Sequence, residues 1–219
     1  MKKRFASGLV MGFLLAISAA WATQSSAIVS TDKDQQITIG VFDYAQAGSG
    51  ILPKAERVTD GLLRNAGVYI LWLACSADES SPRNAGCPNL AGPMKITLHI
   101  VPNSKKERLS KNSDAFGLAV EGGAGEFACD AWVFYDQIRV AAASTGLSLP
   151  QILGSVVAHE LGHLLLGANS HSKRGLMRAR WSREELLEAD FGELSFSNSE
   201  RERIRSSVVA RRQALQAAR

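Results

Sequence analysis

The chain has 219 residues, of which 46% are hydrophobic and 21% are charged, and its formal net charge is +4. This length suits one domain with a sizeable core, and no internal repeat, low-complexity tract or linker divides it. The net charge falls to about +1 without the basic residues at positions 2–4, so the composition gives no support to nucleic-acid binding.

The N-terminus carries the features of a secretory signal peptide. Basic residues at positions 2–4 precede an apolar run at 5–20, and small residues offer cleavage after residue 22 or as late as residue 27. The alternative is an uncleaved anchor, which the short run with its serines and glycines disfavours. We therefore expect residues 1–22 to be removed. The remaining domain, residues 28–219, is then a secreted or periplasmic monomer without stable membrane insertion.

The first half of the domain predicts an α+β fold. Pro53–Ala66 places apolar residues on one helical face and is followed by Gly67, so it predicts a helix, and Asp136–Ala143 predicts a shorter one. His99 lies in a predicted strand, opposite that strand's isoleucine and leucine face, and we interpret it as a structural residue. Strands are predicted at Gln36–Phe42, Val68–Leu73, Lys95–Val101, Phe116–Val120 and Ala131–Tyr135.

Three cysteines give an odd number of thiols in an oxidising compartment. Cys75 and Cys87 flank a polar loop rich in Ser, Asn and Gly, so we prefer a disulfide between these two residues. Such a bond would contribute about 2–3 kcal/mol through the entropy of the closed loop. Cys129 would then be a free thiol, although the sequence leaves the other two pairings open.

The most apolar helix of the chain is predicted between Ser148 and Gly167. The segment Ser148-Leu149-Pro150-Gln151 fits a capping box, and Gly167 suits the turn at the C-terminal end. Apolar residues on nearly every side of this helix predict that it is buried. Histidines and a glutamate in such a helix would cost stability without a strong partner, and a metal ion is that partner.

The helix contains the segment His159-Glu160-Leu161-Gly162-His163. The two histidines stand four residues apart, so both imidazoles project from one face and can share a metal. A catalytic zinc site keeps one position for water, whose pKa zinc lowers to about 7, and Glu160 is placed to take a proton from that water. With His171 beyond the helix as the third ligand, the pattern predicts a zinc-dependent hydrolase that binds one Zn²⁺ per chain.

This segment resembles the metzincin zinc peptidases, whose signature is H-E-x-x-H-x-x-G-x-x-H followed by a methionine turn. His159, Glu160 and His163 match the signature position by position. Three residues rather than two separate His163 from Gly167, and three again separate Gly167 from His171. The run His-Ser-x-x-Gly-Leu-Met that begins at His171 is similar to matrixin-like members and to small secreted bacterial zincins.

The resemblance implies the roles of the site residues. It assigns His159, His163 and His171 to the zinc ion and makes Glu160 the general base. It also places Met177 in a methionine turn beneath the metal. The implied function is that of a secreted zinc-dependent endopeptidase acting on peptides or proteins, whose cleavage preference the sequence leaves open.

The resemblance also implies a zincin-like fold. We expect a mixed, mostly parallel twisted sheet with a backing helix and an active-site helix, followed by a small helical part at Ala168–Arg219. In that family an edge strand above the cleft pairs with the extended substrate. Gly117, Leu118 and Ala119 match that strand by order, although an ordinary sheet strand is an equal alternative. The arginine-rich C-terminal stretch predicts a surface helix packed on the domain.

Two alternatives remain open. An acid in the predicted helix Trp181–Phe191 would replace His171 as third ligand in a gluzincin, but we interpret those acids as a solvated helix face; they are Glu184, Glu185, Glu188 and Asp190. The second alternative is a catalytically inactive secreted zincin-like domain that binds zinc or a partner. The intact Glu160 argues against it, because zinc binding alone needs no base.

Overall fold

A computed structural model describes residues 35–76, 87, 90–110, 114–120, 122, 126–167 and 170–218. The predicted signal peptide and most of the loop between Cys75 and Cys87 lie outside these residues. No helix in the described part of the chain is both long enough and apolar enough to cross a membrane.

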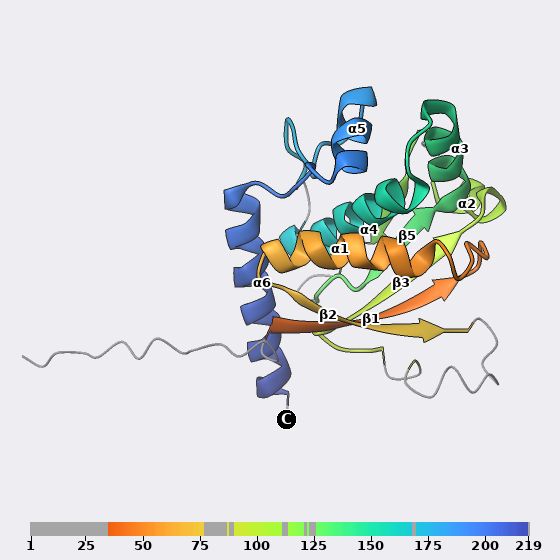
Figure 1. Ribbon diagram of the computed structural model, residues 1–219. Helices are drawn as coiled ribbons and strands as arrows, with labels where there is room; N and C mark the ends of the chain where they lie inside the picture. Colours follow the sequence, from red (N-terminus) through yellow and green to blue (C-terminus); the bar gives the residue numbers. More distant parts are fainter. Residues whose placement is uncertain are drawn as a thin grey trace, which may run out of the picture.

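One five-stranded sheet forms the centre of the described structure (Figure 1). The strands are β1 Gln36–Asp43, β2 Tyr69–Cys75, β3 Lys95–Val101, β4 Gly117–Val120 and β5 Asp130–Phe134. The strand order is β2-β1-β3-β5-β4. Four strands run parallel, and β4 lies antiparallel to β5 at one edge, which confirms the expected mixed and mostly parallel sheet.

Six helices accompany the sheet in the described residues. The helices are α1 Leu52–Asn65, α2 Asn103–Leu109, α3 Tyr135–Thr145, α4 Leu149–Leu166, α5 Arg183–Phe191 and α6 Asn198–Ala217. The sequence analysis does not predict α2, because its polar sequence Asn-Ser-Lys-Lys-Glu-Arg-Leu carries no apolar periodicity.

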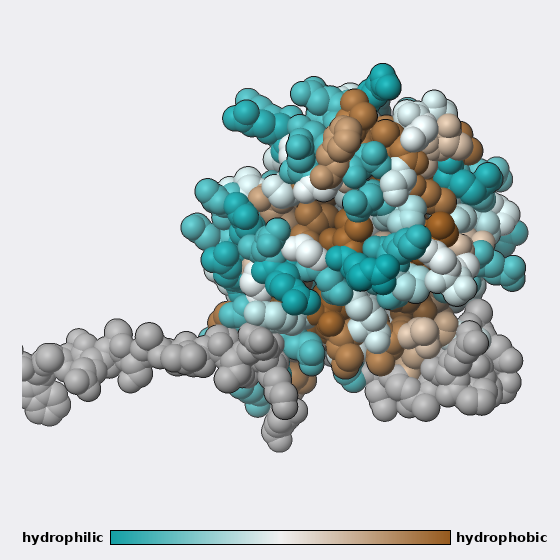
Figure 2. Space-filling view, viewed as in Figure 1, coloured by the Kyte–Doolittle hydropathy of each residue, from teal (hydrophilic) through white to brown (hydrophobic). Residues whose placement is uncertain are grey.

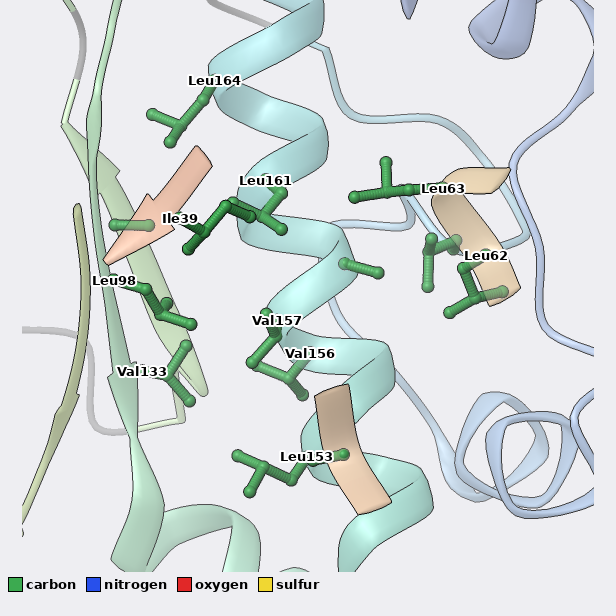
Figure 3. Close-up of a cluster of buried hydrophobic side chains, with 14 of the residues drawn as sticks. Ile39, Leu62, Leu63, Leu98, Val133, Leu153, Val156, Val157, Leu161 and Leu164 are labelled. Carbon is green, nitrogen blue, oxygen red and sulfur yellow. The ribbon is translucent and has the colours of Figure 1, made fainter. Parts of the chain in front are cut away.

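The helix α4 is buried on both sides, as its sequence predicts. Figure 3 shows it between sheet residues such as Leu98 and Val133 and the α1 residues Leu62 and Leu63. The two helices approach closely at Gly154, where an added Cβ would lie 2.5 Å from the carbonyl oxygen of Ala55. This packing fixes α4 in the core and leaves little freedom for side chains that it carries.

The predicted capping box at the start of α4 is wrong. Ser148 is the N-cap residue, but its side chain makes no capping hydrogen bond. Pro150 has no N–H to offer, and the N–H of Gln151 bonds to the backbone oxygen of Ser148 instead. The N–H of Ser148 donates to the Asp190 carboxylate of α5 at 2.6 Å, so α5 anchors this end of α4.

Cys75 and Cys87 form the predicted disulfide, with their Cα atoms 5.9 Å apart. Cys129 is a free, partly buried thiol, and its Sγ lies 3.4 Å from the carboxylate of Asp130. His99 stacks on Trp132 with ring centroids 3.9 Å apart. Its neighbour Leu98 belongs to the core, so His99 lies on the opposite face of the sheet from α4. These contacts agree with a structural role for His99.

The C-terminal helix α6 packs against the ends of two core helices. Arg203 donates to the carbonyl oxygen of Leu166 at 2.9 Å, and Arg205 donates to that of Ala66 at 3.1 Å. Arg211 is 1% exposed, although its position in an arginine-rich stretch suggested the surface. Polar side chains surround smaller apolar areas on the face that Figure 2 shows.

Candidate metal centre

Three histidines converge where α4 ends. His159 and His163 lie on one face of α4, and His171 lies in the segment that follows Gly167, which ends the helix with a φ of +84°. One ring nitrogen from each histidine lies within 4.8 Å of the other two. Among the described residues, no other set of histidine, cysteine or acidic side chains forms such a group.

Hydrogen bonds at Nδ1 orient the two helical imidazoles. The Nδ1 of His159 lies 2.6 Å from the carbonyl oxygen of Leu176, and the Nδ1 of His163 lies 2.8 Å from the hydroxyl of Ser170. The two Nε2 atoms therefore face each other, 3.0 Å apart. Metal-binding histidines characteristically use their second ring nitrogen in this way.

The geometry fits a zinc ion. Two nitrogens bound to one tetrahedral zinc at 2.0–2.1 Å lie about 3.3 Å apart, close to the observed separation of the two Nε2 atoms. Burial lowers the pKa of His159 to about 4 and that of His163 to about 3, so both rings are neutral at pH 7. A neutral imidazole is the form that binds a metal. His171 is exposed, and its ring centroid lies 4.6 Å from that of His163.

Two acids of α5, Glu185 and Asp190, have partners of their own, which corrects the interpretation of this helix face as solvated. Glu185 is 4% exposed and accepts hydrogen bonds from the N–H and hydroxyl of Ser182 at 2.7 and 2.6 Å. It also forms an ion pair with Arg178. Burial alone would raise the pKa of Glu185, but these bonds outweigh it and lower the pKa to about 2. Only Glu184 is exposed as expected, and none of these acids joins the histidine group.

Glu160 lies beside the histidines without a hydrogen-bond partner among the described residues. It is 5% exposed, and burial raises its pKa to about 8. A cation held by the histidines would lower that pKa again. The edge strand packs directly on this side chain, because a Cβ added at Gly117 would lie 2.4 Å from Oε1 of Glu160. No pattern in the sequence predicts this contact.

Met177 lies beneath the histidine face of α4. A Cβ added at Gly162 would lie 2.5 Å from the Sδ of Met177 and 2.9 Å from the ring of Phe196. Met177 is fully buried, and its carbonyl oxygen accepts a hydrogen bond from the N–H of Ser172 at 2.8 Å. This turn places Met177 against Gly162, between the two helical histidines in the sequence of α4, and Gly162 is the residue that makes room for it.

The histidines and Glu160 open into a cavity of about 1490 Å³. The edge strand β4 lines one part of it, and Trp181 lines another with its ring 5.9 Å from that of His159. Residues of α3 and α6, including Val140 and Arg203, extend the lining away from the histidines. The cavity is therefore longer than the histidine group.

Comparisons with known proteins add little to this geometry. No model of a protein family matches the chain, and no curated protein matches its sequence. Among solved structures, the chain is similar to the archaemetzincin of Methanopyrus kandleri, with 15% sequence identity and a TM-score of 0.44. The similarity covers 80% of this chain and 96% of that chain. A likeness of this size assigns no activity, so a function can be inferred only from the geometry of the side chains.

Proposed function

We propose that this protein is a secreted zinc-dependent endopeptidase. The observation that carries the proposal is the pair of Nε2 atoms of His159 and His163, which face each other 3.0 Å apart while both Nδ1 atoms are hydrogen-bonded elsewhere. The signal-like N-terminus and the disulfide support secretion, because disulfides persist in oxidising compartments.

His159, His163 and His171 would hold the ion. When bound, zinc would polarise the carbonyl of the substrate and acidify the attacking water. Glu160 would accept the proton from that water on its carboxylate and pass it to the leaving amine. Its burial supports this role, because a carboxylate shielded from water exchanges protons closer to neutral pH than an exposed one.

The edge strand β4 supports a peptide as the substrate. Among the described strands β4 pairs only with β5, so its other edge is available to add an extended chain by backbone hydrogen bonds. Gly117, Leu118 and Ala119 form this edge, and the contact of Gly117 with Glu160 would bring the bound chain to the base. The cavity continues beyond the histidines toward α3 and α6, which favours the interior of a chain over its end.

A catalytically inactive zinc-binding domain is the second candidate. It would need the three histidines but not a buried carboxylate. Burial raises the pKa of Glu160 to about 8 while the side chain lines the cavity, and a strongly perturbed carboxyl group in a cleft is typical of a functional site. The position of Glu160 therefore favours the enzyme.

Hydrolysis of a general protein substrate tests the proposal. The zinc-loaded mature protein should cleave an unfolded protein at internal bonds, and a chelator should stop the reaction until zinc is restored. Glu160→Gln should bind zinc as the wild type does and should cleave about 10²–10⁴-fold more slowly. Zinc binding without cleavage by the wild type would favour the inactive domain, and no zinc binding would contradict both candidates.

A further inference from the structure

Residues 178–181 line the cavity beside the histidines, together with the edge strand β4. The ring centroid of Trp181 lies 5.9 Å from that of His159 and 6.4 Å from that of Phe116, which directly precedes β4. A peptide paired with β4 would therefore pass next to residues 178–181, and the side chains of this segment would contact it.

The backbone of this segment is held from both ends by Glu185 of α5. The carboxylate of Glu185 forms an ion pair with Arg178 and accepts a hydrogen bond from the N–H of Ser182 at 2.7 Å. The N–H of Arg178 also donates to the carbonyl oxygen of Gly175 at 3.1 Å. Side chains on a backbone fixed in this way can bind a ligand without the entropy cost of ordering a loop.

Arg180 differs from the other arginines that line the cavity. Arg178 is held in its ion pair, and Arg203 and Arg211 donate to backbone carbonyl oxygens. Arg180 is exposed and has no hydrogen-bond or ion-pair partner in the part of the chain that the structure describes. Its guanidinium therefore keeps its donors for a ligand.

A carboxylate is the peptide group that suits this side chain. A planar guanidinium can donate two parallel hydrogen bonds to a carboxylate, which a lysine ammonium cannot do. Asp114 also lines the cavity, but it interacts electrostatically with Lys106 and forms no ion pair with Arg180. The charge of Arg180 is thus available to an acid supplied by the substrate.

We propose that Arg180 is a specificity-determining residue that binds an acidic side chain of the substrate close to the scissile bond. The inference rests on the proposed peptidase function and names the substrates that the cavity prefers. Trp181 follows Arg180 in the chain and its ring lies beside that of His159, so the acidic side chain lies near the bond that is cleaved.

Peptide binding tests the inference without cleavage. The peptides share one sequence with an amidated C-terminus, and a single Glu or Gln occupies each position in turn. Fluorescence anisotropy measures their binding to the slowly cleaving Glu160→Gln variant, with zinc supplied. At one position the Glu peptide should bind about tenfold more tightly than the Gln peptide.

Changes of charge at Arg180, made in the same Glu160→Gln background, should shift this preference. Arg180→Gln should bind the Glu and Gln peptides equally, and Arg180→Glu should bind a Lys peptide more tightly than the Gln peptide. Both variants should unfold at the same urea concentration as the parent protein, because Arg180 makes no hydrogen bond within the described fold. Arg183→Gln is the matched control and should keep the preference, since Arg183 is exposed on α5 and does not line the cavity.

Two results would overturn the inference. The first is equal binding of the Glu and Gln peptides at every position, or a preference for Glu that Arg180→Gln retains. The second is tight binding of a Gln peptide once its C-terminus is a free carboxylate, with no preference for an internal Glu, because Arg180 would then bind the end of a chain.

Cleavage by the protein with Glu160 intact separates the inference from the proposed function. Cleavage without a preference for Glu would overturn only the role of Arg180. A preference for Glu in binding without any cleavage would overturn only the peptidase, and peptides that are neither bound nor cleaved would overturn both.

Discussion

Two buried ionisable side chains, Arg211 of α6 and Glu160 of α4, differ in the hydrogen bonds that they make. Arg211 is 1% exposed and donates to the carbonyl oxygens of Pro93, Ala128 and Leu164 at 2.7–2.9 Å. Glu160 is 5% exposed and has no hydrogen-bond partner among the described residues. The guanidinium of Arg211 holds elements together through these three bonds, although its Nε has no partner among the described residues. The carboxylate of Glu160 makes no such bond and lies beside three convergent histidines. The contrast separates a structural ion from a group kept for chemistry.

The largest expected effect comes from removing the carboxylate of Glu160. Glu160→Gln should lower kcat by about 10²–10⁴-fold because the general base is lost. Its unfolding free energy should stay equal or rise, because a neutral amide costs less to bury than a carboxylate. Steady-state kinetics check the fall in kcat, and urea unfolding checks the free energy of unfolding. Retained activity, or a marked loss of stability, would place Glu160 in the same class as Arg211.

Arg211→Met should have the opposite profile. Three carbonyl groups would lose their donor, so the free energy of unfolding should fall by about 3 kcal/mol or more. Arg201→Ala is the matched control, since among the described residues the side chain of Arg201 bonds only to Asn198, at the surface of α6, and its loss should change stability by about 0.5 kcal/mol or less. Urea unfolding checks both variants. Equal stability of the two would show that the buried guanidinium is not structural.

Glu185 extends the comparison to a second buried glutamate, one with partners. Its pKa is about 2 in the folded protein against an ordinary 4.5, so it stabilises the fold fully above about pH 4.5. Glu185→Gln should therefore cost about 2–3 kcal/mol at pH 7. The difference from the wild type should shrink as the pH falls from about 4.5 toward 2. Unfolding measured across that range checks this, and a constant difference would contradict it.

Gly117→Ala should sharpen the comparison by disturbing Glu160 without removing it. The added methyl group would overlap Oε1 and push the carboxylate aside. We expect kcat to fall by about 10–100-fold with zinc content unchanged. Gly61→Ala is the matched control, because nothing lies within 4 Å of its added Cβ on α1. Equal activity of the two variants would contradict a role of β4 in positioning Glu160.

Local patterns made much of the fold predictable. The alternation in Lys95–Val101 predicts the bounds of β3, and the apolar run before Gly167 predicts those of α4. The polar helix Asn103–Leu109 escaped prediction because it has no apolar face. The order of the strands also could not be read, because it depends on contacts between segments far apart in the chain.

The candidate site divides in the same way. The spacing of His159 and His163 in a helical sequence is enough to predict that their rings meet. The hydroxyl of Ser170, the fit of Gly117 on Glu160 and the burial of Arg211 all arise from tertiary packing. No single segment of the sequence predicts such contacts. Ser170 stands beside His171 and Gly162 lies in an apolar helix, but neither residue shows from the sequence what its side chain or backbone will contact.

Zinc analysis of the purified protein tests the central claim most directly. Zinc content should be measured together with X-ray absorption of the bound ion, in the wild type and in His171→Ala. The account predicts about one zinc per chain held by three imidazole nitrogens, with binding weakened in His171→Ala. No zinc in the wild type after reconstitution would contradict it.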